Sequence, residues 1–262
     1  MTWLSLVLAA AIAQATPAAP PLTRAEMAVF LQKAPIVRSR SISKGITAPV
    51  RLTLSDGRVT HDAAFQRVDE QKSVQEFGSG RREYNFVDSW RYNVAAFQIA
   101  ELIGIGEMMP VTVERKWAGS SGALSWWVDT LMDEAERLKK KREPPDSERW
   151  NRQMQTLRVF TELVDDTDRN LGNVLITPEW QICMIDYTRA FRLSSAIRDG
   201  EITRCDRKLL EALEALTLAS LTSVAQRYLT PYEIKAVLER RDRIVARVRR
   251  LIADKGEAAV LY

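Results

Sequence analysis

The segment between residues 164 and 186 constrains the fold of this chain most strongly. It places acidic and amide side chains around two short apolar runs, 174–176 and 182–185, with a turn sequence at 178–180 between them. Short apolar runs joined by a Pro-containing turn predict a β-hairpin. The polar residues that flank the hairpin should then lie together at its open end.

The register of this hairpin decides which polar side chains meet. If Thr177 pairs with Gln181, then Gly172 faces Asp186 and Asn173 lies beside that pair. Facing residues in an antiparallel pair lie about 5 Å apart. We therefore expect Asn173 and Asp186 to meet, although they are 13 positions apart in the sequence.

A further carboxylate, Asp168, precedes Asn173 by five positions, in the loop that enters the hairpin. Phosphoryl transfer in kinases uses this Asp-x-x-x-x-Asn spacing, followed by a second Asp. One carboxylate orients a hydroxyl, while the amide and the other carboxylate bind Mg²⁺. Hard oxygen ligands suit Mg²⁺, which proteins hold through one or two carboxylates together with substrate phosphates. Asp168, Asn173 and Asp186 are therefore the candidate site residues.

Two other interpretations of this acidic segment are a calcium-binding loop and a capped, solvated turn. Residues 166–170 resemble the first ligands of a calcium loop, but Leu171 stands where that loop requires Gly, and Thr177 stands where it requires Glu. Alternatively, the acids cap a turn and solvate a loop, which suits Asp165 and Asp166. It suits the candidate metal ligands less well, because a solvating charge seldom ends an apolar strand.

The remaining patterns in the first half predict a small sheet with one inserted helix. Alternating apolar residues predict a hairpin over residues 50–68, followed by a polar loop at 76–82. Apolar residues at helical spacing predict a helix over 90–102. Residues 110–114 and 123–128 predict two more strands.

The second half is predicted to be mainly helical. Apolar residues recur at three and four positions over 150–164, which indicates an amphipathic helix. Thr230, Pro231 and Glu233 form a capping box that begins a long final helix. We expect an N-terminal segment at 16–35, a small lobe at 36–138, a charged linker at 139–149 and a larger lobe at 150–262.

The chain begins with an uncharged apolar run at 3–13, which ends in the small-x-small sequence Ala13-Gln14-Ala15. The run is shorter than the roughly 20 residues that a bilayer span needs. It predicts a signal peptide over 1–15 and export to a periplasm, a secretory lumen or the cell exterior. An uncleaved anchor and a buried helix are the alternatives. No later run of 18 apolar residues occurs, so we expect no transmembrane span in the mature chain.

The composition narrows the chemistry. A single histidine, His61, which we expect on a strand surface, argues against most His-based metal centres. Two cysteines cannot form a disulfide scaffold, but Cys183 and Cys205 could pair in an oxidising compartment or remain separate buried thiols. The net charge of +4 arises from 38 basic and 34 acidic residues, so we expect no nucleic-acid partner.

The motif Asp168-Arg169-Asn170-x-x-Asn173, followed by Ile185-Asp186-Tyr187, resembles the catalytic and metal loops of atypical kinases. These include phosphatidylinositol kinase-like enzymes, HipA-type kinases and secreted Golgi kinases, and the order of elements is similar over roughly residues 40–255. The resemblance implies an α+β, two-lobed kinase-like fold that uses ATP and Mg²⁺. It makes Asp168 the catalytic base and Asn173 and Asp186 the metal ligands. It also implies that residues 43–47, with Lys44 and Gly45, cover the nucleotide phosphates.

The sequence departs from those kinases at an ion pair. They hold the nucleotide phosphates with a Lys from the small lobe, paired to a Glu on the inserted helix. Here the Lys position falls on Gln66, with Arg67 beside it, and the Glu position falls on Asn93. Losing both charges avoids leaving one of them buried and unpaired. Either Arg67 or Lys72 takes over the phosphate contact, or the nucleotide site is weak or vestigial.

These observations predict a magnesium-dependent phosphotransferase that uses a nucleotide donor. The acceptor is an unknown protein, lipid or small molecule. The principal alternative is a pseudokinase that binds a nucleotide or a protein without turnover, which the neutral Gln66 and Asn93 favour. A third hypothesis is transfer of a nucleotidyl group through the same acidic residues.

Overall fold

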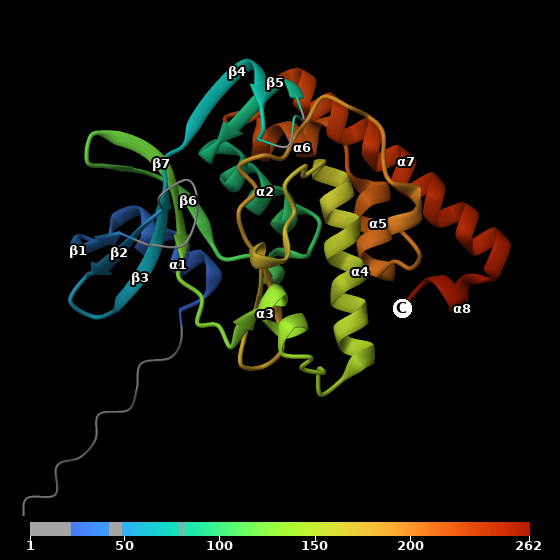
Figure 1. The fold of residues 1–262 in the computed structure, drawn as a ribbon, viewed down its shortest axis with the longest axis horizontal. Helices are drawn as coiled ribbons and strands as arrows, with labels where there is room; N and C mark the ends of the chain where they lie inside the picture. Colours follow the sequence, from blue (N-terminus) through green and yellow to red (C-terminus); the bar gives the residue numbers. More distant parts are fainter. Residues whose placement is uncertain (1–21, 42–48, 79, 81) are drawn as a thin grey trace, which may run out of the picture.

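The computed structural model describes residues 22–41, 49–78, 80 and 82–262. It has two lobes, a smaller one built on β-strands and a larger one built on helices, with helix α2 (Trp90–Leu102) between them (Figure 1). The predicted α+β, two-lobed architecture is therefore confirmed. The predicted signal peptide at 1–15, together with Lys44 and Gly45, lies outside the described residues.

The small lobe is built on a five-stranded antiparallel sheet in the order β1-β2-β3-β7-β6. Inward-facing apolar residues such as Leu52, Leu54 and Phe65 are buried, as their alternation predicts. The expected hairpin and the two later strands are all present. The five strands are β1 (Ile36–Ser41), β2 (Val50–Ser55), β3 (Thr60–Gln66), β6 (Thr112–Trp117) and β7 (Ser120–Trp126).

Helix α1 (Arg24–Lys33) packs on this sheet and was not predicted from the sequence. It buries Phe30 and Leu31. Arg115 on β6 donates to the carbonyl oxygens of Leu31, at 2.5 Å, and Ala34, at 2.9 Å. The arginine therefore satisfies carbonyl groups that a helix end leaves without partners.

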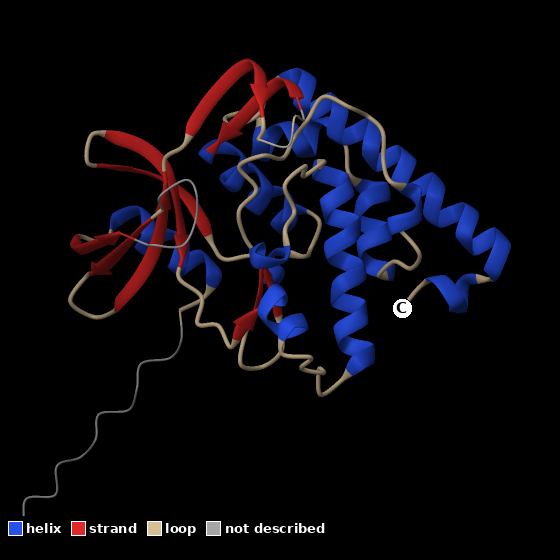
Figure 2. Ribbon diagram, in the orientation of Figure 1, coloured by secondary structure: helices blue, strands red, loops and turns tan. Residues whose placement is uncertain are grey.

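A second hairpin, made by β4 (Asp69–Glu76) and β5 (Arg82–Ser89), was also missed. The sequence analysis placed only a polar loop at 76–82. Side chains of β4 are almost all exposed, so the strand lacks the apolar alternation that identifies a half-buried strand. Figure 2 shows this ribbon leaving the five-stranded sheet and running toward the helical lobe. The amide of Ser89 donates to the carbonyl oxygen of Thr188 at 2.9 Å, which joins the ribbon to the larger lobe.

Helix α2 begins where the sequence predicts and connects the two lobes. The side chain of Ser89 caps it by accepting from the amide of Arg91. Val94 packs toward the sheet, while Ile99 and Ile103 join the large core shared with the helical lobe. Because α2 is buried on both sides, its polar residue Asn93 lies at the junction of the two lobes.

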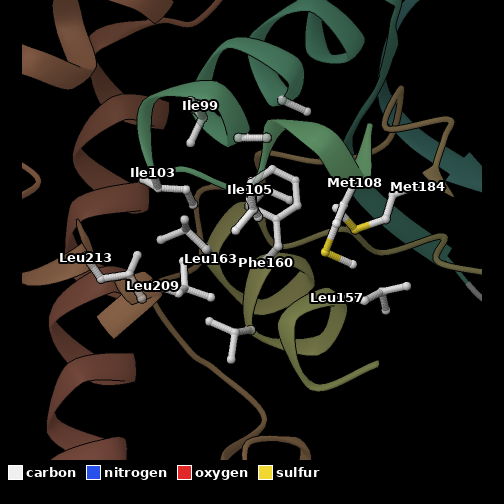
Figure 3. Packing of buried hydrophobic residues seen from close by; sticks show 14 of the residues in the cluster. Ile99, Ile103, Ile105, Met108, Leu157, Phe160, Leu163, Met184, Leu209 and Leu213 are labelled. Atoms are coloured by element: carbon white, nitrogen blue, oxygen red, sulfur yellow. The ribbon is translucent and has the colours of Figure 1, made fainter. Parts of the chain in front are cut away.

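The larger lobe surrounds that core with helices (Figure 3). Helix α4 (Ser147–Val164) and the capping box of α7 (Pro231–Lys255) confirm the sequence predictions. A three-stranded sheet lies beside them in the order β10-β9-β8. The other elements are β8 (Met132–Asp133), α3 (Glu134–Lys139), β9 (Val174–Ile176), β10 (Ile182–Met184), α5 (Arg207–Ala215), α6 (Leu218–Ala225), α8 (Glu257–Val260) and short 3₁₀ turns at Gly106–Met108, Leu171–Asn173 and Asp199–Glu201.

The chain leaves the five-stranded sheet at Trp126, and β8 already pairs with β9 in the larger lobe. Of the predicted linker at 139–149, residues 140–146 join α3 to α4. Cys183 and Cys205 are free, buried thiols, and burial raises the pKa of each to about 12. None of the helices among the described residues is both long and apolar enough to cross a bilayer.

Candidate active site

The hairpin of β9 and β10 has the predicted register. Val174 pairs with Met184, the amide of Thr177 donates to the carbonyl oxygen of Gln181 at 3.0 Å, and that of Ile185 donates to Asn173 at 3.1 Å. The backbones of Asn173 and Asp186 therefore lie at the open end of the hairpin, as expected. Both residues lie just outside strands that are three residues long, so the register of the hairpin brings their backbones together.

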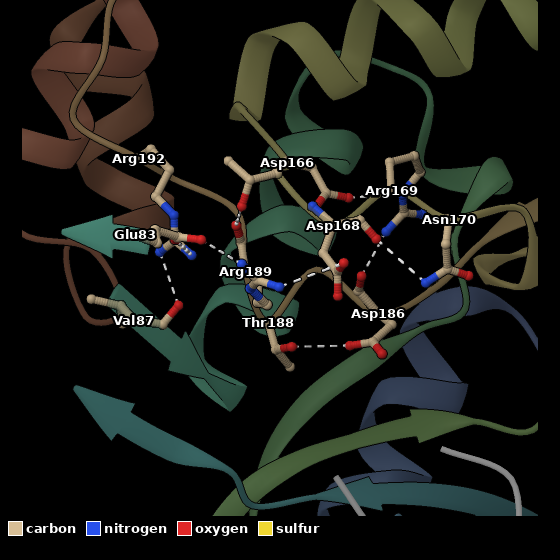
Figure 4. A network of polar contacts seen from close by, with 11 residues as sticks. Glu83, Val87, Asp166, Asp168, Arg169, Asn170, Asp186, Thr188, Arg189 and Arg192 are labelled. Carbon is tan, nitrogen blue, oxygen red and sulfur yellow. Dashed lines mark hydrogen bonds and ion pairs between the residues drawn. The ribbon is translucent and has the colours of Figure 1, made fainter. Parts of the chain in front are cut away.

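Arg169 organises this end of the hairpin (Figure 4). Its Nε pairs with Oδ2 of Asp166 at 2.7 Å, and its Nη2 donates to the carbonyl oxygen of Asp186 at 2.6 Å. Its Nη1 donates to the carbonyl oxygen of Asn173 at 3.3 Å, and the guanidinium lies over the ring of Tyr187. One cation thus fixes the backbone beside both predicted metal ligands.

The two acids of this loop have opposite environments. Only 1% of the Asp166 side chain is exposed, and its Oδ1 accepts from the amide of Asp168 at 3.0 Å. Asp166 therefore caps a turn, as one interpretation expected, but it does not solvate the loop, because its carboxylate is a buried partner of Arg169. The Asp168 side chain is 55% exposed and is therefore accessible to solvent.

Asp186 adopts a left-handed backbone conformation with φ of 58°. Its Oδ1 accepts from the Thr188 hydroxyl at 3.1 Å and from Nε2 of Gln66 at 3.4 Å. Burial raises the pKa of Asp186 above its usual range, while the Thr188 hydrogen bond and the charge of Arg169 act against that rise. A carboxylate held away from water gains strongly from a nearby cation.

Gln66 and Asn93 contact one another at the lobe junction. Nδ2 of Asn93 donates to Oε1 of Gln66 at 2.6 Å, and Oδ1 of Asn93 accepts from the amide of Tyr187 at 2.6 Å. With the Gln66 contact to Asp186, these bonds connect β3, α2 and the segment after β10. The two positions that were aligned with the kinase Lys–Glu pair therefore form a neutral amide pair.

The other cations predicted for the phosphate contact are Arg67 and Lys72. Arg67 is exposed at the end of β3. Lys72 on β4 pairs with Glu70 at 2.8 Å and donates to Gln75 at 3.0 Å. These contacts keep the ammonium of Lys72 on the surface of the ribbon.

A chain of charges that the sequence analysis missed leads away from Asp168 (Figure 4). Nη1 of Arg189 lies 3.5 Å from Oδ1 of Asp168, and its Nη2 lies 2.5 Å from Glu83 on β5. Arg192 pairs with the same Glu83 at 2.7 Å. Arg189 follows Asp186 by only three positions, but its partner lies on the strand that sequence patterning did not detect.

The residues present suit a magnesium ion. Within the described ranges, no group of three or more His, Cys, Asp or Glu side chains could hold a metal by itself. Magnesium does not require such a group, because substrate phosphates and waters complete its octahedral shell. The buried carboxylate of Asp186 and the amide of Asn173 provide hard oxygen donors of the right kind.

A cavity of about 780 Å³ opens between the β4–β5 ribbon, the segment after β10 and the start of α7. Thr167, the neighbour of Asp168 in sequence, lines it together with Tyr84, Tyr92 and Tyr232. Tyr84 and Tyr232 are largely exposed at its rim. The cavity therefore borders the loop that carries the predicted catalytic base.

Comparisons with known proteins identify the fold. No protein-family model and no curated protein matches the chain. A solved structure of hydra Fam20 with sugar is 14% identical, covers 91% of each chain and has a TM-score of 0.66. The Helicobacter pylori proinflammatory kinase CtkA is 11% identical, with 87% of this chain and 98% of that chain covered and a TM-score of 0.49. The chain therefore shares the two-lobed fold of hydra Fam20.

Proposed function

We propose that this protein is a magnesium-dependent phosphotransferase that transfers a phosphoryl group from a nucleotide such as ATP to an alcohol acceptor. The observation that carries this proposal is the arrangement around Arg169. One guanidinium bonds the backbone carbonyls of Asn173 and Asp186, and the same loop presents the exposed carboxylate of Asp168. Three oxygen-bearing side chains with kinase spacing are thus supported by one framework on a kinase-like fold.

Asp168 is the proposed base. Its carboxylate accepts the proton of the acceptor hydroxyl while the acceptor oxygen forms a bond to the terminal phosphorus. The bond between that phosphorus and the bridging oxygen breaks, and the nucleoside diphosphate leaves with its electron pair. The Arg189 guanidinium, 3.5 Å away, orients the carboxylate.

Asn173 and Asp186 are the proposed metal ligands. They would hold Mg²⁺ through their side-chain oxygens, and the ion would supply positive charge against the negative charge that develops during transfer. Gln66 and Asn93 orient Asp186 by bonding to its carboxylate and to the next backbone amide. As neutral amides, they orient the carboxylate without bringing a charged side chain of their own to it.

The neutral pair also favours a second candidate, a pseudokinase that binds nucleotide without turnover. Kinases use the corresponding Lys to neutralise nucleotide phosphates, and an amide provides no charge for this purpose. The two candidates predict the same metal-dependent binding but different products. Nucleotidyl transfer, the third candidate, differs again because it releases pyrophosphate.

The acceptor and the location of the protein are also proposals. The cavity beside Thr167 supports an acceptor with a hydroxyl and a body that fits among tyrosine rings. The solved structure of hydra Fam20 is one with sugar, which makes hydroxyl-rich small molecules the first acceptors to test. The apolar run at the N-terminus supports export, and sequencing the N-terminus of the secreted protein tests whether cleavage follows Ala15.

The decisive experiment incubates the protein with Mg-ATP and a panel of sugar, lipid and peptide alcohols, and measures ADP and pyrophosphate separately. The phosphotransferase proposal expects acceptor-dependent ADP that falls at least 100-fold in Asp168→Asn, in line with loss of a general base. Nucleotide binding without ADP from any acceptor class would favour the pseudokinase. Pyrophosphate release would favour nucleotidyl transfer.

A further inference from the structure

A second carboxylate, Asp88, lies beside Asp186 and has no role in the proposed function so far. It is the next-to-last residue of β5, in the small lobe, and is half-buried. Its Oδ1 is inaccessible to solvent and has no hydrogen-bond partner among the described residues. Buried carboxylate oxygens nearly always have a partner, so an orphaned one calls for an explanation.

The backbone brings Asp88 to the metal loop. The amide of Ser89 donates to the carbonyl oxygen of Thr188 at 2.9 Å, which aligns the end of β5 with the segment after Asp186. The Thr188 hydroxyl donates to Oδ1 of Asp186 at 3.1 Å and also interacts with the Asp88 carboxyl. A hydroxyl has a single proton, so it cannot donate to both carboxylates at once.

The electrostatics agree with this geometry. Burial raises the pKa of Asp88, the charge of Asp186 raises it further, and Arg189 acts in the opposite direction. Two like charges at close quarters are unfavourable unless a proton or a cation lies between them. Glu70, which pairs with Asp88 across the ribbon, adds another negative charge, although Lys72 partly neutralises it.

We propose that Asp88 is a ligand of the divalent cation, donating its unpartnered Oδ1 from the small lobe opposite Asp186 of the large lobe. This inference rests on the proposed function, because it concerns the same magnesium site. Two carboxylates lie within the one or two that Mg²⁺ usually takes from a protein beside nucleotide phosphates. A shared cation would make metal binding depend on how the two lobes meet.

The test measures binding of Mn²⁺ to the full protein by electron paramagnetic resonance of the free ion, with a non-hydrolysable ATP analogue present. Asp88→Asn keeps the size of the side chain and is expected to weaken Mn²⁺ binding at least tenfold. Glu70→Gln is the matched control, since it removes a neighbouring charge of the same sign but leaves Asp88 in place. It is expected to change the affinity less than twofold.

A second readout separates ligation from folding. Without metal, Asp88→Asn is expected to melt at or above the temperature of the wild type, because it removes repulsion from Asp186. A lower melting temperature would overturn the proposal by giving the carboxylate a structural role.

The outcomes also separate this inference from the proposed function. If Asp186→Asn loses Mn²⁺ but Asp88→Asn binds it like the wild type, the ligand role of Asp88 is wrong and the proposed function stands. Equal losses in Asp88→Asn and Glu70→Gln would reduce the effect to general charge and also overturn the ligand role. A wild-type protein that binds no Mn²⁺ would remove both proposals.

Discussion

The two halves of the candidate site are built from different interactions. The large-lobe half depends on charge, since Arg169 pairs with a buried Asp166 and Arg189 pairs with both Asp168 and Glu83. The small-lobe half depends on neutral amides, since Gln66 and Asn93, the two positions that the sequence analysis aligned with the kinase ion pair, bond to one another. Both halves are anchored, but the contacts between Gln66 and Asn93 carry no formal charge.

This difference teaches that connecting the lobes and binding phosphate are separable tasks. In kinases the Lys–Glu pair does both. Here the amide pair connects β3 to α2 and to the segment after β10, but it offers no cation to a phosphate. In the proposed function, most of the positive charge that balances the nucleotide phosphates therefore comes from the bound metal ion. The following predictions test this contrast.

The largest effect is expected in the charged half. Arg169→Leu leaves the buried carboxylate of Asp166 without its partner and removes the donors to Asn173 and Asp186. Breaking a buried ion pair costs about 3–5 kcal/mol. Urea unfolding should show this loss of unfolding free energy, whereas a loss below about 1 kcal/mol would contradict the organising role of Arg169.

A smaller effect is expected in the neutral half. Asn93→Leu leaves the amide of Tyr187 and Oε1 of Gln66 without their partner. Each unsatisfied buried group costs about 1–3 kcal/mol, and we expect a total near 2 kcal/mol because Gln66 can reorient. Arg91→Ala on the same helix, which removes an exposed pair with Asp69, is the control. If both variants lose the same unfolding free energy, the amide bridge has no special role.

A double substitution replaces the neutral amide pair of the small-lobe half by an ion pair. Gln66→Lys with Asn93→Glu restores the ion pair that kinases use, and its cation lies beside Asp186, where the nucleotide phosphates would bind. We expect affinity for Mg-ATP to rise about tenfold, which is about 1.4 kcal/mol. Isothermal titration measures it. Weaker binding than in the wild type would show that the amide pair is adapted to this site in a way the account does not explain.

The smallest effect concerns His61 on β3. Burial lowers its pKa below the usual 6.5, while its Nε2 bonds the carbonyl oxygen of Trp127 and its ring stacks on Trp126. Because the folded pKa is lower than the unfolded one, its contribution to stability is present above pH 6.5 and is lost as the pH falls. The titration of this single histidine, followed by nuclear magnetic resonance, should have a midpoint below 6.5. A midpoint above 6.5 would contradict the burial of the ring.

Much of the site could be predicted because it depends on local pattern. The apolar runs around the turn at 178–180 fixed the register that brings Asn173 to Asp186. The spacing of the polar residues then predicted phosphoryl transfer. Alignment with kinases placed Gln66 and Asn93 at the positions of the Lys–Glu pair. These features follow from strand periodicity and spacing, which a single sequence carries.

The remainder depends on contacts between distant segments. The ribbon β4–β5 has no apolar alternation, so Glu83 and Asp88 could not be associated with the loop after β10. Asp165 and Asp166 look equivalent in sequence, but only Asp166 faces Arg169. Which acid is buried depends on the tertiary arrangement of the loop and not on its composition.

The central claim is that Asp186 holds a divalent cation for a nucleotide. The direct measurement is the thermal shift caused by Mg-ATP in the wild type and in Asp186→Asn. Asparagine tolerates the left-handed backbone at this position and keeps an oxygen that can accept from Thr188, so the substitution removes the charge alone. The account predicts a clear rise in melting temperature in the wild type and none in the variant. An equal rise in both proteins, or no rise in either at millimolar nucleotide, would contradict it.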